Sequence, residues 1–168
     1  GTEKAMPEIS FTKEKLTKKY GNADYKYEVT TNSTGKVVYR SSNTAVAEPD
    51  QFGYITIKKA GSCTITARVA ADANYKSASA GYQLVVSKKN MTKKKVKLSK
   101  TSYIYAGKNC KPKAVVSGLA RSDYKVTYKN ADKPGTAICV ITGKGNYSGK
   151  IEVPYSINLA KTVITKIT

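Results

Sequence analysis

The sequence predicts an all-β fold of two β-sandwiches in tandem, and three observations lead to it. Residues 135–157 alternate apolar and polar side chains on both sides of a break at 143–146, where glycine and asparagine tolerate the positive φ of a sharp reversal. A weaker copy of this stretch occupies residues 61–86. Short strands separated by turns fill the rest of the chain, as is typical of sandwich folds.

The two copies share their features in the same order, which divides the chain of 168 residues into two units of roughly 75–90 residues each. Each copy has a glycine, an alternating strand, an Asn-Tyr pair and a closing strand that carries a tyrosine. The chain has 13 tyrosines but only 2 phenylalanines and no tryptophan. Tyrosine can pack its ring inward while the hydroxyl stays in water, which suits a thin sandwich.

Turn residues separate the strands expected in the first unit. Ile9 and Phe11 begin a first edge strand. The basic stretch 13–19 is interrupted by Tyr20-Gly21-Asn22, and we interpret it as irregular strand or loop. The remaining strands of this unit are expected at residues 25–29, 36–40, 45–47, 54–57, 63–69 and 81–86.

A polar stretch with five lysines, residues 87–95, marks the boundary between the units. We therefore expect one domain at 1–88, a second at 89–159 and a tail at 160–168. Residues 162–167 have strand character, and they are either the first strand of a further module, an ordered tail or a strand added to the second unit. Strands of the second unit are expected at residues 96–98, 102–105, 110–116, 124–128, 137–141 and 151–157.

Positive charge is concentrated in the second unit. Residues 1–88 have 13 Lys and Arg against 8 Asp and Glu, whereas residues 89–168 have 17 against 3, so the net charge of +19 divides into +5 and +14. Such a surface attracts polyanions. Only Arg40, Arg68 and Arg121 are arginines, and specific base readout and bidentate phosphate binding favour arginine. The composition therefore favours solubility or diffuse polyanion contact, and no nucleic-acid partner is expected.

Several functional classes lack the residues that they need. The chain has no histidine, the commonest general base and the commonest transition-metal ligand, so no enzyme activity and no cofactor are expected. The acids of the second unit are too scattered for a calcium site, and Glu48 and Asp50 beside Pro49 are better explained by a solvated turn. Gly143-Lys144-Gly145 lacks the full phosphate-loop pattern. No apolar run is long enough to span a membrane.

Two stretches resemble known repeat families. The first, VVYRSSNTAVAEPDQFGYITIKKAGSCTITA, is similar to bacterial immunoglobulin-like repeats of the group-2, invasin/intimin-related type, and YIYAGKNCKPKAVV with DYKVTYKNADKPGTAICVITGKGNYSG resembles a related repeat of Gram-positive multidomain surface proteins. The first pattern is matched by Tyr39, Ser41, Ser42, Asn43, Val46, Ala47, Gly53, Ile55, Thr56, Ala60, Gly61, Thr64, Ile65, Thr66 and Ala67.

This resemblance implies two tandem immunoglobulin-like β-sandwich domains in a secreted or cell-wall-attached protein of a Gram-positive bacterium. It also implies neighbouring immunoglobulin-like or fibronectin-III-like modules in the same chain. Partners of such modules include cell-wall polymers, glycans and host surface proteins. The resemblance does not identify a ligand, because such modules serve as stalks, spacers and adhesive tips alike.

Cys110 and Cys139 both fall on the inward side of their expected strands. They either form a disulfide across the sandwich, which would stabilise it by roughly 3–4 kcal/mol, or are two reduced core residues. In the related repeat, aliphatic residues stand at these two positions. Cys63 has no partner within its unit and is expected in the core.

The densest group of cations has two interpretations, a polyanion contact between the domains or a solvated linker. It consists of Lys88, Lys89, Lys93, Lys94 and Lys95. A second set of residues, tyrosines next to lysines, is either a platform for glycans or single strands or a row of core residues. These tyrosines are Tyr103, Tyr105, Tyr124 and Tyr128.

Three functional hypotheses follow for the whole chain. The first is a non-catalytic spacer or adhesive segment of a bacterial surface protein. The second is a polyanion-binding module that holds wall teichoic acid or a similar polymer through its lysines. The third is an accessory segment of a large secreted enzyme.

Overall fold

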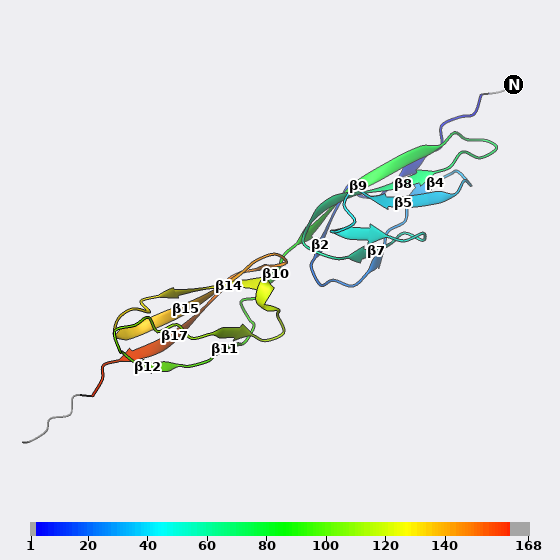
Figure 1. Ribbon diagram of the computed structural model, residues 1–168. Coiled ribbons are helices and arrows are strands. Elements are labelled where there is room, and N and C mark those ends of the chain that lie inside the picture. Colours follow the sequence, from blue (N-terminus) through cyan, green and yellow to red (C-terminus); the bar gives the residue numbers. More distant parts are fainter. Residues whose placement is uncertain (1–2, 162–168) are drawn as a thin grey trace, which may run out of the picture. The chain divides into compact units, whose positions relative to one another are not determined.

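The computed structural model describes residues 3–161 and consists almost entirely of β-strands (Figure 1). One 3-10 turn, Arg121–Asp123, is the only helical element in this range. The chain divides into two compact units, one ending at Lys89 and the other starting at Asn90. Both units are immunoglobulin-like β-sandwiches, which confirms the predicted fold class.

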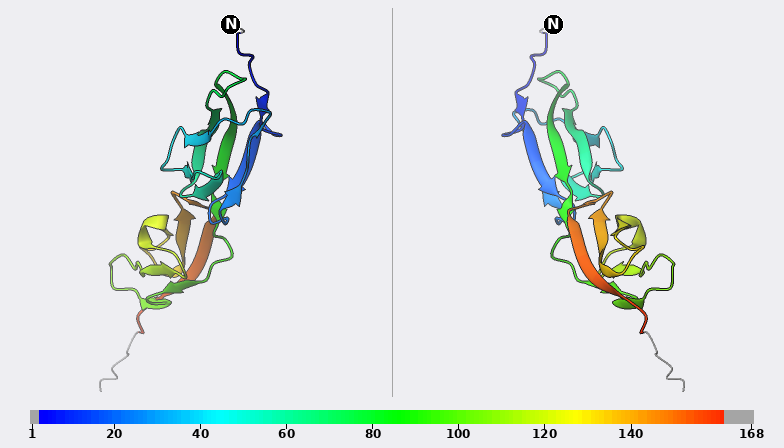
Figure 2. Two further views of the ribbon diagram at one scale, coloured as in Figure 1. Left: turned by 90° about the vertical axis from the view of Figure 1, so that its right-hand side faces the viewer. Right: turned by 90° about the vertical axis from the view of Figure 1, so that its left-hand side faces the viewer.

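In the first unit, a four-stranded sheet has the order β2-β9-β8-β5, and a three-stranded sheet has the order β3-β7-β6 (Figure 2). A short pair, β1 with β4, completes the unit. The strands of this unit are β1 (Ile9–Ser10), β2 (Lys15–Lys19), β3 (Tyr25–Lys26), β4 (Thr30–Thr31), β5 (Val37–Ser41), β6 (Ala47–Pro49), β7 (Tyr54–Ile57), β8 (Gly61–Val69) and β9 (Ala78–Ser87).

Strand β2 differs from the expectation of irregular strand or loop, because it pairs with the last strand of the unit. It runs parallel to β9, with Leu16 opposite Leu84 and Lys19 opposite Ser87. Its own sequence has a single apolar residue, so its strand conformation depends on this pairing. The core beneath it is filled by alternate residues of the long strands, including Ile65, Tyr82 and Leu84.

The strands of the second unit give a four-stranded sheet of the same kind, β12-β17-β15-β14, in which β12 and β17 are again parallel. Its second layer is a single antiparallel pair, β11 with β13. The bounds are β11 (Val96–Leu98), β12 (Ser102–Ile104), β13 (Ala114–Val116), β14 (Tyr124–Lys129), β15 (Gly135–Gly143), β16 (Tyr147–Ser148) and β17 (Lys150–Asn158), and the two residues of β10 (Lys89–Asn90) lie on either side of the unit boundary.

The second unit has a thinner second layer because one connection is short. In the first unit, β6 and β7 lie between β5 and β8 in the chain. In the second unit, β14 turns directly into β15 through residues 130–134, and Asn130 has a positive φ of 57° at this turn. No counterpart of β6 or β7 exists among the described residues of this unit.

The core of the second unit contains both of its cysteines, two buried tyrosines and four half-buried ones. Tyr155 is buried, its hydroxyl donates to the Cys110 carbonyl at 2.6 Å, and burial raises its pKa to about 12. Cys110 lies four residues before β13, so the strand expected at 110–116 is wrong over its first part. Residues 162–167, for which a strand was considered, lie outside the described residues.

Candidate functional site

The five lysines predicted as a polyanion contact belong to both units. Lys88 and Lys89 follow β9, whereas Lys93, Lys94 and Lys95 lie in and after a turn that begins at the buried Met91. All five are exposed except Lys94, which is half-buried. None of the ion pairs found among the described residues includes any of them. Their role in polyanion binding therefore stays a prediction.

All three cysteines are buried free thiols. Of the two alternatives for Cys110 and Cys139, a disulfide or two reduced core residues, the structure contains the second. Cys139 lies in the middle of β15, and burial raises the pKa of its thiol. The Cys110 thiol donates to the Lys108 carbonyl at 3.5 Å. A raised pKa keeps a thiol protonated and unreactive, which fits packing residues rather than nucleophiles.

The turn regions considered as sites have structural partners. Glu48 forms an ion pair with Lys58, and Asp50 accepts hydrogen bonds from the backbone of Phe52 and Tyr54. The Gly143-Lys144-Gly145 segment is a turn in which Gly145 has a φ of +65°. No group of three or more potential metal ligands occurs among residues 3–161.

The tyrosines of β14 connect the two layers of the second unit. Tyr124 is buried, and its hydroxyl lies 3.4 Å from the Val116 amide nitrogen and 3.3 Å from the Ala114 carbonyl oxygen. The Tyr128 hydroxyl donates to the Pro112 carbonyl. Burial raises the pKa of Tyr128, which keeps this hydroxyl protonated as a donor. For these two tyrosines, the structural interpretation is the better one.

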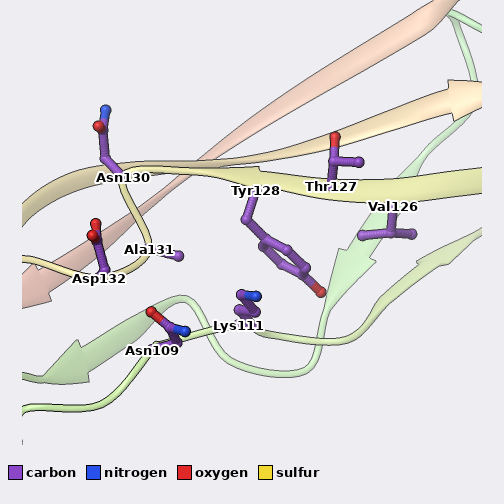
Figure 3. A pocket seen from close by; sticks show the side chains of 8 residues that line it. All are labelled: Asn109, Lys111, Val126, Thr127, Tyr128, Asn130, Ala131 and Asp132. Carbon is purple, nitrogen blue, oxygen red and sulfur yellow. The ribbon is translucent and has the colours of Figure 1, made fainter.

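Beside these tyrosines lies a groove that the sequence did not predict, and we call it the β14 groove. It consists of two adjoining hollows of about 460 and 450 Å³, both of which are lined by Val126 and Tyr128. Figure 3 shows the first hollow, where the Tyr128 ring points from β14 towards the segment that carries Lys111. The groove follows the side of the unit where β6 and β7 have no counterpart.

The lining of the β14 groove is basic and partly apolar. Lys111 Nζ lies 5.8 Å from the centre of the Tyr128 ring, and Arg121 Cζ lies 5.1 Å from that of Tyr124. Arg121 also donates to the Tyr124 carbonyl at 2.6 Å. Lys113 is a third cation, and Asp132 is the one acid among the lining residues. The groove therefore favours a ligand with negative charge.

One signal in the sequence could have indicated the groove. The connection that follows the strand 124–128 is a short turn, whereas 22 residues separate the strands expected at 36–40 and 63–69, and these hold two further strands. The difference in length predicts that the second sandwich lacks part of one layer. The sequence does not predict that the cations surround the resulting opening, which is seen only in the three-dimensional structure.

The comparisons with known proteins agree with the fold. Residues 29–72 match the family described as intimin, immunoglobulin-like domain, a range that starts before β4 and ends after β8. No curated protein matches the chain.

Solved structures similar to the chain include a cadherin, a protocadherin and a set of immunoglobulin domains. Human protocadherin-24 EC1-2 is 10% identical with a TM-score of 0.42, and the match covers 96% of this chain and 100% of that one. Mouse cadherin-23 EC22-24 is 10% identical with a TM-score of 0.38, and the match covers 92% and 65%. Sidekick-1 immunoglobulin domains 1-4 is 11% identical with a TM-score of 0.38, and the match covers 96% and 51%. The chain thus spans about two thirds of the cadherin-23 structure and half of the Sidekick-1 structure.

The family match over residues 29–72 agrees with the immunoglobulin-like sandwich of the first unit. In the described part of the chain, no helix has both the length and the apolar character that crossing a membrane requires.

Proposed function

We propose that the chain is a load-bearing spacer and adhesion segment of a bacterial surface protein, secreted or attached to the cell wall. The observation that carries the proposal is the parallel pairing of an early strand with the last strand in each unit. β2 runs parallel to β9, and β12 runs parallel to β17. In each unit the chain therefore enters near one end of the sheet and leaves at the other end.

This pairing determines how each unit responds to tension. When the two ends of a unit are pulled apart, β2 must slide along β9, so the hydrogen bonds between them are loaded together rather than one at a time. The same holds for β12 and β17, where the chain leaves next to the Ile104–Asn158 pair. A unit built this way resists stretching, which is what a spacer between a cell and its contact surface needs.

Single-molecule force spectroscopy on the chain, held at its two ends, tests the load-bearing role. We expect two separate unfolding events, each releasing roughly 25–30 nm of chain at roughly 3.5 Å per residue, less the folded length of the unit. Leu16→Pro, which disrupts the pairing of β2 with β9, should lower the unfolding force of the first unit only. Thr17→Pro, in the same strand but with its N–H facing away from β9, serves as the matched control. Extension without force peaks would overturn the load-bearing role.

The location has its own test. An antibody raised against the chain should label intact cells of the organism that produces it, and brief protease treatment of those cells should remove the label. Labelling that appears only after the cells are permeabilised would contradict a surface location. The measurement is flow cytometry of intact and permeabilised cells.

A second candidate function is the binding of an anionic polymer such as wall teichoic acid, and one observation favours it. Among the described residues of the second unit, Lys129 is the only cation with a carboxylate at ion-pair distance, that of Glu152 at 3.2 Å. The other cations in the described part of this unit have no carboxylate at ion-pair distance that would compete with an external polyanion. Binding to purified wall teichoic acid should weaken steeply between 50 and 200 mM salt, to an extent of about 10³-fold if six phosphates are contacted. Salt-independent binding, or none, would exclude this function.

A further inference from the structure

The free edge of β14 is a feature that neither proposed function uses. β14 is the last strand of its sheet and has one neighbour, β15. In the first unit, the corresponding strand β5 lies close to β6. In the second unit, no described strand takes the place of β6, so the outer edge of β14 faces the β14 groove. Such an edge offers backbone donors and acceptors to another extended chain.

The register identifies which residues present these groups. The Lys144 amide donates to the Asp123 carbonyl at 3.0 Å, and the ladder continues without interruption from Tyr124 opposite Gly143 to Lys129 opposite Ile138. Hydrogen-bonded and non-hydrogen-bonded pairs alternate in an antiparallel ladder. The backbone groups of Val126 and Tyr128 therefore point away from β15, towards the open edge.

The nearby edge of β13 is closed in a different way. Its outward groups at Ala114 and Val116 are occupied by the Tyr124 hydroxyl, and the Pro112 carbonyl is occupied by the Tyr128 hydroxyl. An incoming strand would have to displace these tyrosines from β13, whereas at β14 it meets unoccupied groups. Of the two edges beside the groove, only that of β14 can accept a strand without breaking existing bonds.

The side chains around this edge select the kind of strand. The hollows beside Val126 and Tyr128 can receive side chains from every second residue of an added strand, as pockets do in strand-addition complexes. Val115, which also lines the groove, is 60% exposed and offers further apolar surface. Lys111, Lys113 and Arg121 supply positive charge against the single acid Asp132.

We propose that the β14 edge binds an extended acidic segment of a partner protein, which adds as a strand beside β14 and places alternate apolar side chains in the β14 groove. A polyanionic glycan would use the cations, but it would leave the unpaired backbone groups of Val126 and Tyr128 unsatisfied. The edge thus favours a peptide over a glycan. This proposal does not depend on the load-bearing role or on teichoic-acid binding.

Selection from a display library of random twelve-residue peptides against the whole chain tests the proposal. We expect the enriched sequences to be acidic and to carry apolar residues at every second position. Val126→Pro removes an outward N–H without touching the ladder to β15, a place where an edge strand tolerates proline. We expect this variant to bind the selected peptide at least about tenfold more weakly, because one backbone hydrogen bond is lost and its partner left unmade.

Two controls separate this edge from general charge attraction and from misfolding. Lys111→Glu with Lys113→Glu should weaken peptide binding, whereas Lys144→Glu with Lys150→Glu, which changes the net charge equally at exposed positions elsewhere, should leave it nearly unchanged. A peptide methylated at alternate backbone nitrogens should lose binding to the unmodified protein, which tests the edge even if Val126→Pro fails to fold.

Three results would overturn the proposal. The first is a selection that enriches neutral or basic peptides, or that enriches no peptide at all. The second is equal loss of binding in both double-lysine variants, which would indicate diffuse electrostatics. The third is tight binding of a sulfated or phosphorylated glycan that depends on Lys111 and Lys113 but not on the Val126 backbone, which would assign the groove to glycans.

Discussion

At the scale of single residues, tyrosine hydroxyls replace a missing strand in the second unit. Tyr124 reaches from β14 to the outward backbone groups of β13, and Tyr128 reaches to the Pro112 carbonyl just before it. A sandwich that lacks part of one layer would otherwise leave these groups unpaired next to an opening, at a cost of about 1–3 kcal/mol for each buried group. The abundance of tyrosine in the sequence indicated rings packed inward, but not this use of their hydroxyls.

Removal of either hydroxyl should therefore destabilise the second unit. Tyr124→Phe and Tyr128→Phe are each expected to lower its free energy of unfolding by about 1–3 kcal/mol, because a backbone group loses its partner. Urea denaturation measures the change. The control is Tyr105→Phe, at a half-buried tyrosine whose hydroxyl does not bond the backbone of residues 112–116. Equal losses in all three variants would show that the hydroxyl bonds to the backbone of residues 112–116 are not what stabilises the unit.

A second residue with a structural role at this scale is Asp72, whose carboxylate accepts hydrogen bonds that hold the loop before β9. One carboxylate oxygen accepts hydrogen bonds from the Asn74 and Tyr75 amides, and the other accepts from Thr34 and Ser33. The Asn74 amide, followed by that of Tyr75, holds the pKa of this carboxyl far below its usual range. The charged form is therefore favoured in the folded state.

This shift predicts how the stability of the first unit depends on pH. A depressed pKa contributes stability that is fully present above the unfolded value of about 3.9 and is lost as the pH falls towards the folded value. The urea concentration at which the first unit is half unfolded, measured between pH 2.5 and 7, should decrease below about pH 4. In Asp72→Asn this decrease should be smaller. Asp24→Asn is a control acid. An unchanged acid slope in Asp72→Asn would contradict the role.

At the scale of elements, the position of proline in β17 shows how neighbouring strands decide what a sequence tolerates. β17 lies between β12 and β15, yet it contains Pro154. The Ser156 amide donates towards the β12 side, to the Thr101 carbonyl at 3.1 Å, so position 154 faces the same side. β12 pairs only from Ser156 onwards, so proline stands where no partner strand needs an N–H.

Moving the proline by one residue should therefore have a large effect. Val153 lies opposite Cys139 and faces β15, so Val153→Pro removes a ladder hydrogen bond and should cost about 3 kcal/mol or more. Pro154→Ala should change stability by less than about 1 kcal/mol. Thermal unfolding followed by circular dichroism compares the two. A similar loss in both variants would mean that the assigned sides of β17 are reversed.

The same elements show what the sequence can and cannot predict. Strands β7, β8, β15 and β17 were expected close to their observed bounds, because alternation over a half-buried face is a local property. β2 was not recognised as a regular strand, since its sequence is mostly lysine and its conformation depends on β9, more than 60 residues away. The short turn after β14 indicated the missing part of a layer, but the lining of the β14 groove could not be predicted for a related reason: Lys111 and Arg121 come to lie beside Val126 only when the sheets pack.

At the scale of the whole molecule, each unit has a core of its own. Buried residues of the first unit, such as Ile65 and Leu84, form one cluster, and those of the second, such as Ile141 and Ile157, form another, with no residue in common. Stability in such an arrangement resides within each unit. The similar four-stranded sheets and the parallel pairs at the ends of both units support the same conclusion.

Separate cores predict that each unit folds when the other is removed. A fragment of residues 90–168 should unfold at the same urea concentration as the second unit of the whole chain, and a fragment of residues 1–89 should match the first. Tyrosine fluorescence follows both transitions, and Tyr124→Phe in the whole chain identifies which transition belongs to the second unit. A fragment that is unfolded without denaturant, or a single transition that Tyr124→Phe shifts as a whole, would mean that the two sandwiches stabilise each other.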